Sequence, residues 1–355
     1  MGSENNLQCR FFNECGGCDF LDLSTKDYQN LKIKFLEEIF AKNKIQIHSN
    51  IEYNWFGKGK RRKITLQVNK QNKIGFFAKK SHVIVEIDEC IISEEKISKL
   101  IIPLKNLLNS VAQNIINQIT ITSFDSGIDL IFSCQKDSDF SFENKIVLFA
   151  KENKLNASIQ NKNGLTPLFI SHKNQIFYSD FKIDLASNIF IQATKNGLEK
   201  ILELIDEQIS GKNNIADIYS GFGAYTFSIA QKSQVTAFEG SEKMIELIKK
   251  NTAKNSLNNN IKFINRDLFS NPLESKELNK FDLAIINPPR NGATPQIEEI
   301  AKSKLNHIIY VSCNPITFTF DAKILVNSGF KITKMNALDQ FYGSKHLELV
   351  AILKR

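Results

Sequence analysis

The spacing of apolar residues changes character a little past the middle of the 355-residue chain. After about residue 195, short apolar runs alternate with stretches of helical period, which is typical of strands separated by helices. Seven runs are predicted to be strands: NIADIYSG, QVTAFEGS, IKFINRDL, FDLAIINPP, HIIYVSC, FKITKMNAL and HLELVAILKR. This alternation predicts a doubly wound parallel sheet, in which the last two strands pair antiparallel because only a short turn separates them.

The first half of the chain has a mixed pattern of helices and short strands. A helix is predicted to begin at Ser24, because Asp27 follows at capping distance. Its apolar residues recur on one helical face: Tyr28, Leu31, Phe35 and Ile39. A second helix is predicted near 94–117. The remaining runs are predicted to be strands: RRKITLQV, KIGFFAKK, SHVIVEIDEC, QITITSF, IDLIFSC, KIVLFA and LFISH.

Composition is that of an ordinary globular protein, with 42% hydrophobic and 24% charged residues. No apolar run is long enough to span a membrane, and the first residues do not have the pattern of a secretory signal, so we expect a cytoplasmic protein. The formal net charge of +8 is consistent with a polyanionic partner, but a general excess of lysine would produce the same value.

A glycine-containing turn follows the first strand of the second half, in the segment DIYSGFGAYTF. Gly221 and Gly223 would let the backbone approach a ligand closely, although glycines also occur in such turns for packing alone. The third glycine of the dinucleotide fingerprint is absent, which disfavours NAD. Glu239 ends the next strand. Its carboxylate could bind the ribose of an adenosine, or it could simply be an acidic residue at the N-terminus of the helix that follows Ser241. Asp267, after the third strand, is placed to read an adenine amino group.

The fourth and fifth strands end in residues that suit chemistry. The loop Asn287-Pro288-Pro289-Arg290 is stiffened by its prolines and lies where substrates bind in such sheets, although it would also serve as a plain loop. Cys313 ends the next strand beside it, as a candidate nucleophile or as an inert buried thiol. His346 and Glu348 share one face of the last strand.

Together these segments resemble the S-adenosylmethionine-dependent RNA uracil-5 methyltransferases, and specifically the iron–sulfur type without the additional N-terminal TRAM domain. The segments that carry the resemblance are SCNPITFTFD, DIYSGFGAYTF, NPPRNG, FYGSKHLE and FIQAT. The resemblance implies that Cys313 adds to carbon 6 of uracil, that carbon 5 then takes the methyl group, and that Glu348 removes the carbon-5 proton as general base.

The turn, the acidic residues and the resemblance give one set of expected cofactor contacts: Gln192, Tyr219, Gly221, Gly223, Ala224, Glu239, Asp267 and Asn287. The chain departs from the family pattern at several positions. Asn287 stands where an acid is usual, which removes a charge near the cofactor or the uracil. Ser220 replaces a cysteine, Thr194 an asparagine and Phe320 an arginine, while the residues before the base differ as well.

Three cysteines cluster near the start of the sequence. Cys9, Cys15 and Cys18 have the spacing C-x5-C-x2-C, and Cys90 follows after 71 intervening residues. Four thiolates suit zinc or an iron–sulfur cluster, and the resemblance favours a [4Fe–4S] cluster over zinc. Its role is expected to be structural or RNA-positioning, because methyl transfer requires no electron. Cys134 is expected to be a core residue.

A dense basic run enters one of the early strands. It consists of Lys58, Lys60, Arg61, Arg62 and Lys63. Phosphate contact is one interpretation and a solvated hairpin face is the other. By resemblance we expect an RNA partner, with 23S ribosomal RNA favoured over tRNA, no membrane partner and a monomeric enzyme.

The expected architecture is therefore α/β. It comprises a cluster loop at 1–22 completed by Cys90, a central α+β RNA-binding domain at 23–190, and a Rossmann-like seven-stranded class I methyltransferase domain at 191–355. Two alternatives remain open. An amino-group methyltransferase would use the NPPR loop, although an aromatic residue is usual where Arg290 stands. A non-catalytic RNA-binding or assembly protein would keep the fold without needing Cys313.

Overall fold

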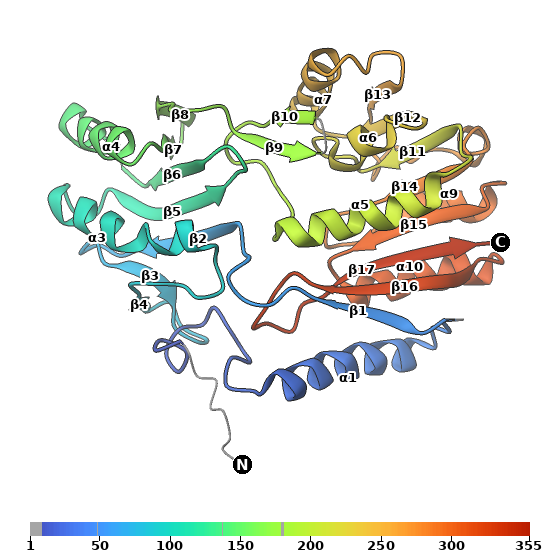
Figure 1. The fold of residues 1–355 in the computed structure, drawn as a ribbon, viewed down its shortest axis with the longest axis horizontal. Coiled ribbons are helices and arrows are strands. Elements are labelled where there is room, and N and C mark those ends of the chain that lie inside the picture. The colour runs from blue at the N-terminus through green and yellow to red at the C-terminus, as the bar shows by residue number, and fades with distance from the viewer. Residues whose placement is uncertain (1–8, 48, 137, 179–180) are drawn as a thin grey trace. The chain divides into compact units, whose positions relative to one another are not determined.

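A computed structural model describes residues 9–47, 49–136, 138–178 and 181–355 (Figure 1). The chain forms two compact units, and each of them is discontinuous in sequence. Unit 1 comprises Met1–Tyr28, Gly57–Lys195 and Phe341–Lys345, and unit 2 comprises Gln29–Phe56, Asn196–Gln340 and His346–Arg355. This division differs from the one drawn from the sequence, because residues 29–56 pack within unit 2 and a short segment before Glu348 packs within unit 1.

Unit 2 is built on an eight-stranded sheet. Its strands are β1 (Ile51–Trp55), β11 (Asn214–Ile218), β12 (Gln234–Glu239), β13 (Ile261–Asn265), β14 (Leu283–Ile286), β15 (His307–Ser312), β16 (Lys331–Asp339) and β17 (Glu348–Lys354). They lie in the order β1-β16-β17-β15-β14-β11-β12-β13. The seven predicted strands correspond to β11–β17, and β17 runs antiparallel to both neighbours, as predicted for the last pair.

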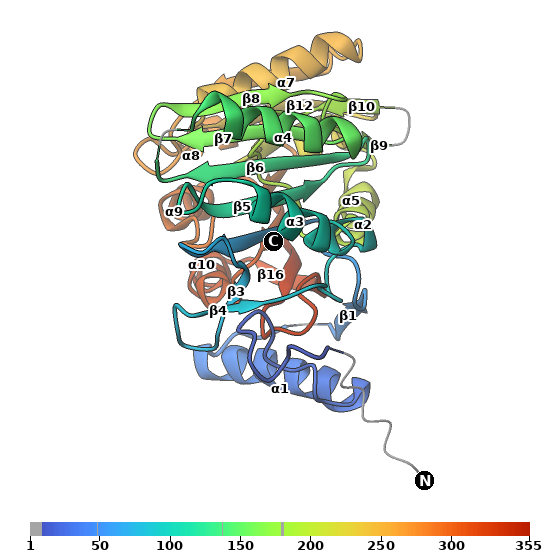
Figure 2. The ribbon, with the colours of Figure 1, turned by 90° about the vertical axis from the view of Figure 1, so that its left-hand side faces the viewer.

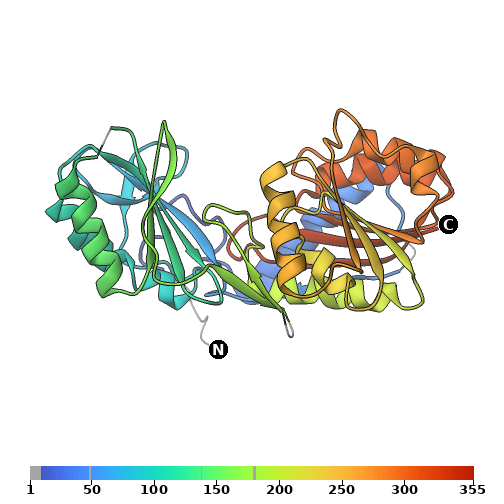
Figure 3. The same cartoon turned by 90° about the horizontal axis from the view of Figure 1, so that it is seen from above.

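Helices cover both faces of this sheet. The helices of unit 2 are most of α1 (Thr25–Asn43) and α5 (Lys195–Ile209), together with α6 (Ala224–Ile229), α7 (Glu242–Lys254), α8 (Ser275–Leu278), α9 (Thr294–Lys302) and α10 (Pro315–Asn327). Figure 3 shows α9 and α10 on one face and α5 on the other. Every residue of β14 and β15 is buried, as expected for central strands covered on both sides.

The strand β1 was not predicted as part of this sheet. It extends the edge of the sheet by pairing parallel with β16, from Ile51 opposite Met335 to Trp55 opposite Asp339. Periodicity describes only local structure, so it contains no signal for a partner strand this far along the chain.

The helix α1 begins where predicted, since the Ser24 hydroxyl accepts a hydrogen bond from the backbone N–H of Asp27 at 3.1 Å. Its buried face was predicted correctly at Tyr28 and one position off at the three later positions. The buried positions are Tyr28, Lys32, Leu36 and Phe40, whereas Leu31, Phe35 and Ile39 are half-buried. The reason is a buried ion pair at the centre of the face, in which Lys32 Nζ lies 2.5 Å from Asp339 Oδ1.

Unit 1 is built on a seven-stranded sheet in the order β4-β3-β2-β5-β6-β7-β8. Its strands are β2 (Lys63–Val68), β3 (Ile74–Phe77), β4 (Ile84–Glu86), β5 (Ile116–Ser123), β6 (Ile128–Cys134), β7 (Asn156–Asn161) and β8 (Gly164–Phe169), and β9 (Gln175–Tyr178) and β10 (Phe181–Asp184) form a separate hairpin. Its helices are α2 (Glu95–Ser98), α3 (Ile101–Ser110) and α4 (Phe140–Glu152). Figure 2 shows α3 and α4 over one face of the sheet.

The prediction of a strand in KIVLFA was wrong, because this segment lies inside α4. Asp139 caps the helix by accepting a hydrogen bond from the Phe142 N–H at 2.8 Å. Phe142, Ile146 and Phe149 then follow at helical spacing and are buried. The run looked like a strand because the helical period is visible only when the residues before it are included. In the part of the chain that the structure describes, no helix is long and apolar enough to cross a membrane.

The Lys32–Asp339 pair should be costly to break from one side. Both side chains are at most 1% exposed. Lys32→Ala would remove the lysine charge that faces the buried Asp339 carboxylate, at a cost of about 3–5 kcal/mol. We expect a clearly lower urea midpoint for the unfolding of unit 2. Lys34→Ala, which removes the exposed Lys34–Glu38 pair of the same helix, is the matched control and should cost at most about 1 kcal/mol. Equal losses in the two variants would contradict this assignment.

Candidate active site

The predicted cofactor residues of unit 2 gather at one edge of its sheet. The strands β14, β11, β12 and β13 are parallel neighbours, so their carboxyl ends meet at that edge. The turn after β11 contains three residues with positive φ, namely Tyr219 at 63°, Gly221 at 57° and Gly223 at 88°. A Cβ on Gly223 would lie only 3.0 Å from the Phe227 ring, so this position requires glycine for both backbone conformation and space. Ala224 then begins α6.

Glu239, the last residue of β12, lies against this turn. One of its carboxylate oxygens accepts the Gly221 N–H at 3.0 Å, and the other accepts the Ser241 N–H at 2.8 Å. The carboxylate therefore connects the glycine turn to the start of α7. Each oxygen keeps a further lone pair, so ribose hydroxyls could be accepted as well, and the two roles weighed from the sequence are compatible.

Asp267 lies in the exposed loop that follows β13. Its carboxylate accepts hydrogen bonds from the Ser270 hydroxyl at 2.7 Å and the Phe269 N–H at 3.0 Å, and these bonds lower the pKa of Asp267. The Phe269 ring packs against the Tyr219 ring, with a centroid distance of 5.4 Å. The loop thus carries an anionic group and an aromatic ring beside the glycine turn.

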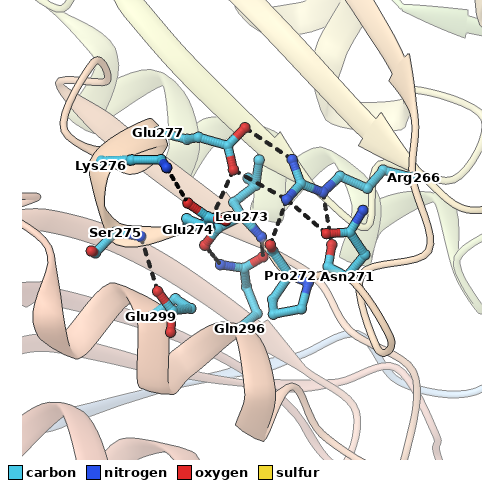
Figure 4. A network of polar contacts seen from close by, with 10 residues as sticks. All are labelled: Arg266, Asn271, Pro272, Leu273, Glu274, Ser275, Lys276, Glu277, Gln296 and Glu299. Atoms are coloured by element: carbon cyan, nitrogen blue, oxygen red, sulfur yellow. Dashed lines mark hydrogen bonds and ion pairs between the residues drawn. The ribbon is translucent and has the colours of Figure 1, made fainter.

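Arg266 holds this loop in shape (Figure 4). Its guanidinium donates to the backbone carbonyls of Asn271 at 2.7 Å and Pro272 at 2.6 Å, and it forms an ion pair with Glu277 at 2.9 Å. A planar guanidinium suits this arrangement because its donors point in fixed directions. Arg266 was not among the predicted site residues, since a lone arginine in a loop gives no signal of its partners.

The proline loop after β14 is fastened at its two ends. The Asn287 side chain donates to the Tyr225 hydroxyl at 3.3 Å. The Arg290 carbonyl accepts from the Asn314 side chain at 3.1 Å and the Thr317 hydroxyl at 3.2 Å, both at the start of α10.

The same helix holds the end of this loop through a buried acid. The Asp321 carboxylate accepts the Ala293 N–H at 2.8 Å and the Thr294 hydroxyl at 2.7 Å. It also accepts the Tyr310 hydroxyl of β15 at 2.6 Å. The loop that carries Arg290 is therefore fixed relative to the strand that ends at Cys313.

Cys313 and Glu348 are brought together by the pairing of β15 with β17. The antiparallel register runs from His307 opposite Lys354 to Ser312 opposite Leu349. Continued by one position, this register places Cys313 opposite Glu348, and side chains that are opposite each other lie on one face of a sheet, about 5 Å apart at Cβ. Cys313 is half-buried, and Glu348 is 3% exposed.

Charge and burial act on both groups. Burial raises the pKa of the Glu348 carboxyl to about 8, and the Arg290 guanidinium acts in the opposite direction. Burial also raises the pKa of the Cys313 thiol, as does the charge of Glu348, while Arg290 lowers it through its charge and a hydrogen bond. Arg290 thus lies close to both groups and stabilises the anionic form of each. This role of Arg290 was not predicted from the sequence, in which Arg290 is only a residue of the proline loop.

Gln192, an expected cofactor contact, and the basic run, an expected RNA contact, lie in unit 1. Gln192 is buried in the segment that leads to α5. The basic run enters β2, where Lys58 and Lys60 are exposed and Arg61 is half-buried.

The next two residues of the run point inward. Arg62 is 2% exposed, and its guanidinium pairs with Asp125 at 3.0 Å and donates to the Ser123 carbonyl at 3.0 Å. Lys63 is half-buried, donates to the Ile189 carbonyl at 3.4 Å, and has a pKa lowered by burial. We therefore leave Arg62 and Lys63 out of the candidate phosphate contacts.

The four cysteines of the predicted cluster all lie in unit 1. Cys15 forms a backbone bridge to Ala78, and its sulfur accepts the Gly17 N–H at 3.4 Å. Burial raises the pKa of Cys18 to about 12, and the charges of Cys90, Cys15 and Cys9 contribute to the rise, so the four sulfurs share one neighbourhood.

The fit of these residues to a metal cluster is mixed. Four thiols without competing ligands are the donor set that iron–sulfur clusters use. Among the described residues, however, no three His, Cys, Asp or Glu side chains are close enough together to hold a metal ion. The chemistry of the donors therefore fits a cluster, while the described residues do not form a closed metal site.

Comparison with known proteins agrees with this fold. Residues 61–355 match the family model of tRNA (uracil-5-)-methyltransferases, and the chain belongs to that family. An RNA methyltransferase of Zymomonas mobilis is 29% identical, covering 98% of this chain and 88% of that protein. The 23S rRNA (uracil(1939)-C(5))-methyltransferase RlmD of Shewanella woodyi is 26% identical, covering 98% and 81%.

The fold also matches a solved structure. The tRNA (uracil-54, C5)-methyltransferase of Pyrococcus abyssi, in complex with S-adenosyl-L-homocysteine, superposes with a TM-score of 0.76 at 22% identity, covering 96% of this chain and 86% of that one. At this identity the match concerns the fold. Membership of the family supports methyl transfer to RNA with S-adenosylmethionine as the donor.

The raised pKa of Glu348 should make stability depend on pH. Between pH 4.5 and about 8 the folded chain holds a proton on Glu348 that the unfolded chain has released. Folding should therefore become less favourable as pH rises through this window, by roughly 1 kcal/mol per pH unit. Glu348→Gln removes this effect. The urea midpoint of the variant should therefore rise relative to that of the parent as the pH increases from 5 to 8. Parallel pH profiles of the two proteins would show that Glu348 ionises normally.

Proposed function

We propose that this protein methylates carbon 5 of a uridine in RNA, with S-adenosylmethionine as donor, Cys313 as nucleophile and Glu348 as general base. The observation that carries the proposal is the register of β15 and β17, which ends at Ser312 opposite Leu349. Continued by one position, it would set the Cys313 thiol opposite the Glu348 carboxyl, and the charge of Glu348 acts on the pKa of Cys313. The family supports the reaction class, and the roles of the individual residues are part of the proposal.

The chemistry requires two anions at different stages. The Cys313 thiolate would attack carbon 6 of uracil, and the electron pair of the carbon 5–carbon 6 double bond would move toward oxygen 4 as an enolate. Carbon 5 would then be nucleophilic and would take the methyl group from the sulfonium of S-adenosylmethionine, whose S–CH3 bond would break to leave S-adenosylhomocysteine. Glu348 would take the proton from carbon 5, the double bond would re-form, and the thiolate would leave carbon 6.

Arg290 would favour the anionic form of both groups. Each anion disfavours the other, since the charge of Glu348 raises the pKa of Cys313. The Arg290 guanidinium lowers the pKa of both groups, and its backbone is held by Asn314 and Thr317. The positive charge of Arg290 would thus offset the negative charges of the Cys313 thiolate and the Glu348 carboxylate.

The cofactor would occupy the edge formed by β11, β12, β13 and β14. We assign the ribose to Glu239 and the adenine to the loop of Asp267. The glycine turn would let the backbone approach the cofactor closely. Asn287 would contribute an amide where a carboxylate is usual in the family, and Gln192 of unit 1 completes the proposed set.

Two nucleic acid substrates are compatible with the family. We favour 23S ribosomal RNA, supported by the RlmD relative that aligns over 98% of this chain. A tRNA substrate is the second candidate, favoured by the family description and by the activity of the Pyrococcus abyssi protein. Exposed Lys58 and Lys60 would contact phosphates in either case. Methylation of an amino group would give the Cys313–Glu348 pair no role.

We also propose that Cys9, Cys15, Cys18 and Cys90 hold a [4Fe–4S] cluster, with zinc as the alternative. The support is the all-thiol donor set and the shared neighbourhood of the four sulfurs. Such a group would join the loop at 9–20 to Cys90 and so stabilise unit 1.

The nucleophile can be tested with RNA that contains 5-fluorouracil. Fluorine cannot leave as a cation, so the reaction should stop after methyl transfer with the RNA covalently bound through Cys313. We expect a protein–RNA adduct that survives denaturing gels and depends on S-adenosylmethionine. Cys313→Ser should form none. Cys134→Ser is the matched control, because Cys134 is also half-buried and lies in unit 1, and it should form the adduct normally.

The same assay identifies the substrate when 23S rRNA fragments and tRNA are offered together. Faster trapping of the rRNA is expected, and selective trapping of tRNA would reverse our preference. Binding of RNA and S-adenosylmethionine by the wild-type chain without any adduct would exclude Cys313 as nucleophile and leave the non-catalytic or amino-group alternatives.

The cluster can be tested by metal analysis. Protein purified without oxygen should be brown and contain about four iron and four sulfide per chain. Cys18→Ser should lose this colour, and Cys134→Ser should keep it. Stoichiometric zinc without sulfide would instead establish a zinc site.

A further inference from the structure

The loop that leads to Glu348 is held by the cysteine-containing segment of unit 1. The loop comprises Phe341–Lys345, and both it and residues 1–28 belong to unit 1. The Gly343 carbonyl accepts two hydrogen bonds, from the Asp19 N–H at 2.7 Å and from the Phe20 N–H at 3.1 Å. The Gly343 N–H donates to the Tyr28 hydroxyl at 3.1 Å. Both backbone groups of this residue are therefore bound.

Gly343 also fits where no larger residue would. Its φ is +81°, in the left-handed region that favours glycine. A Cβ at this position would lie 3.0 Å from Leu21 Cδ2 and 3.3 Å from Cys18 Sγ. The next side chain toward the N-terminus, Tyr342, packs on the Tyr28 ring with a centroid distance of 5.1 Å. The loop is thus fitted closely against the segment around Cys18.

The start of the loop follows a second fixed point, which lies within unit 2. Asp339 ends β16 and is bound to Lys32 in the buried ion pair. The preceding residue, Leu338, pairs with Glu348 across β16 and β17. The loop is fixed at its beginning and at Gly343. Only four residues then separate Gly343 from Glu348, so the backbone of Glu348 can shift little.

We propose that Gly343 and Tyr28 are positioning residues for the general base, and that the cysteine segment serves catalysis by fixing where Glu348 enters β17. This inference rests on the proposed function, because it assumes that Glu348 removes the carbon-5 proton. Neither residue touches the reacting atoms. The cysteine segment would thus affect one chemical step, in addition to any structural role in unit 1.

Loss of this positioning has a specific chemical signature. Displacement of Glu348 would slow proton removal, which follows the addition of Cys313 and the methyl transfer. The methylated RNA would then remain bound through sulfur, even when the RNA contains ordinary uridine. A variant that was merely unstable would lose the adduct and the turnover together.

The experiment compares Gly343→Ala with Gly211→Ala in the full chain. Gly211 has a similar φ of +73°, but a Cβ added there would meet no atom within 4 Å, so it controls for backbone strain alone. With ordinary RNA and S-adenosylmethionine, Gly343→Ala should turn over about 10- to 100-fold more slowly. It should also accumulate a covalent adduct on denaturing gels, as Glu348→Gln should. Gly211→Ala should behave like the wild type.

A second variant guards against a folding defect. Tyr28→Phe removes the hydroxyl that binds Gly343 and keeps the ring, and it should show the same adduct with a smaller loss of turnover. Wild-type turnover in both Gly343→Ala and Tyr28→Phe would overturn the proposal, as would slower turnover in Tyr28→Phe without adduct on ordinary RNA. Failure of the wild-type protein to trap 5-fluorouracil RNA would instead refute the proposed function itself.

Discussion

The insertion of β17 between β15 and β16 is the constraint on which the rest of the site depends. An antiparallel strand in an otherwise parallel sheet reverses direction, so its first residue lies at the edge where its parallel neighbours end. That reversal is what places Glu348 beside Cys313. The parallel strands β14, β11, β12 and β13 bring the predicted cofactor residues to the same edge. Arg290 is then held over both groups by the first turns of α10.

Local patterns were enough to predict much of this arrangement. The seven strands after residue 195 and the antiparallel last pair followed from apolar runs and loop lengths, because these depend on neighbouring residues. The positions of Gly221, Gly223 and Cys313 at strand ends followed in the same way. The proximity of Cys313 and Glu348 was predicted from the alternation of side chains along the last strand, combined with a family resemblance. The register of β15 with β17 supplies the physical reason for it.

The features that the sequence did not predict are interactions between distant residues. Lys32 and Asp339 are 307 positions apart, and a lysine inside a helix is normally assigned to the solvated face. Arg62 looked like a phosphate ligand within a basic run, but Asp125 neutralises it in the interior. Arg290 and Arg266 act through partners that only the fold brings together. In each case a charged residue has a role that depends on its partner, and composition cannot reveal the partner.

The position of β17 also has a consequence for how the protein is made. Ribosomes deliver strands in chain order, yet this sheet receives one of its central strands after all the others. Until β17 emerges, β15 and β16 have unpaired edges facing each other, and such edges invite pairing with other chains. The nascent methyltransferase sheet is therefore most vulnerable to aggregation late in synthesis. Cys313 and Glu348 come together only in the final step of assembly.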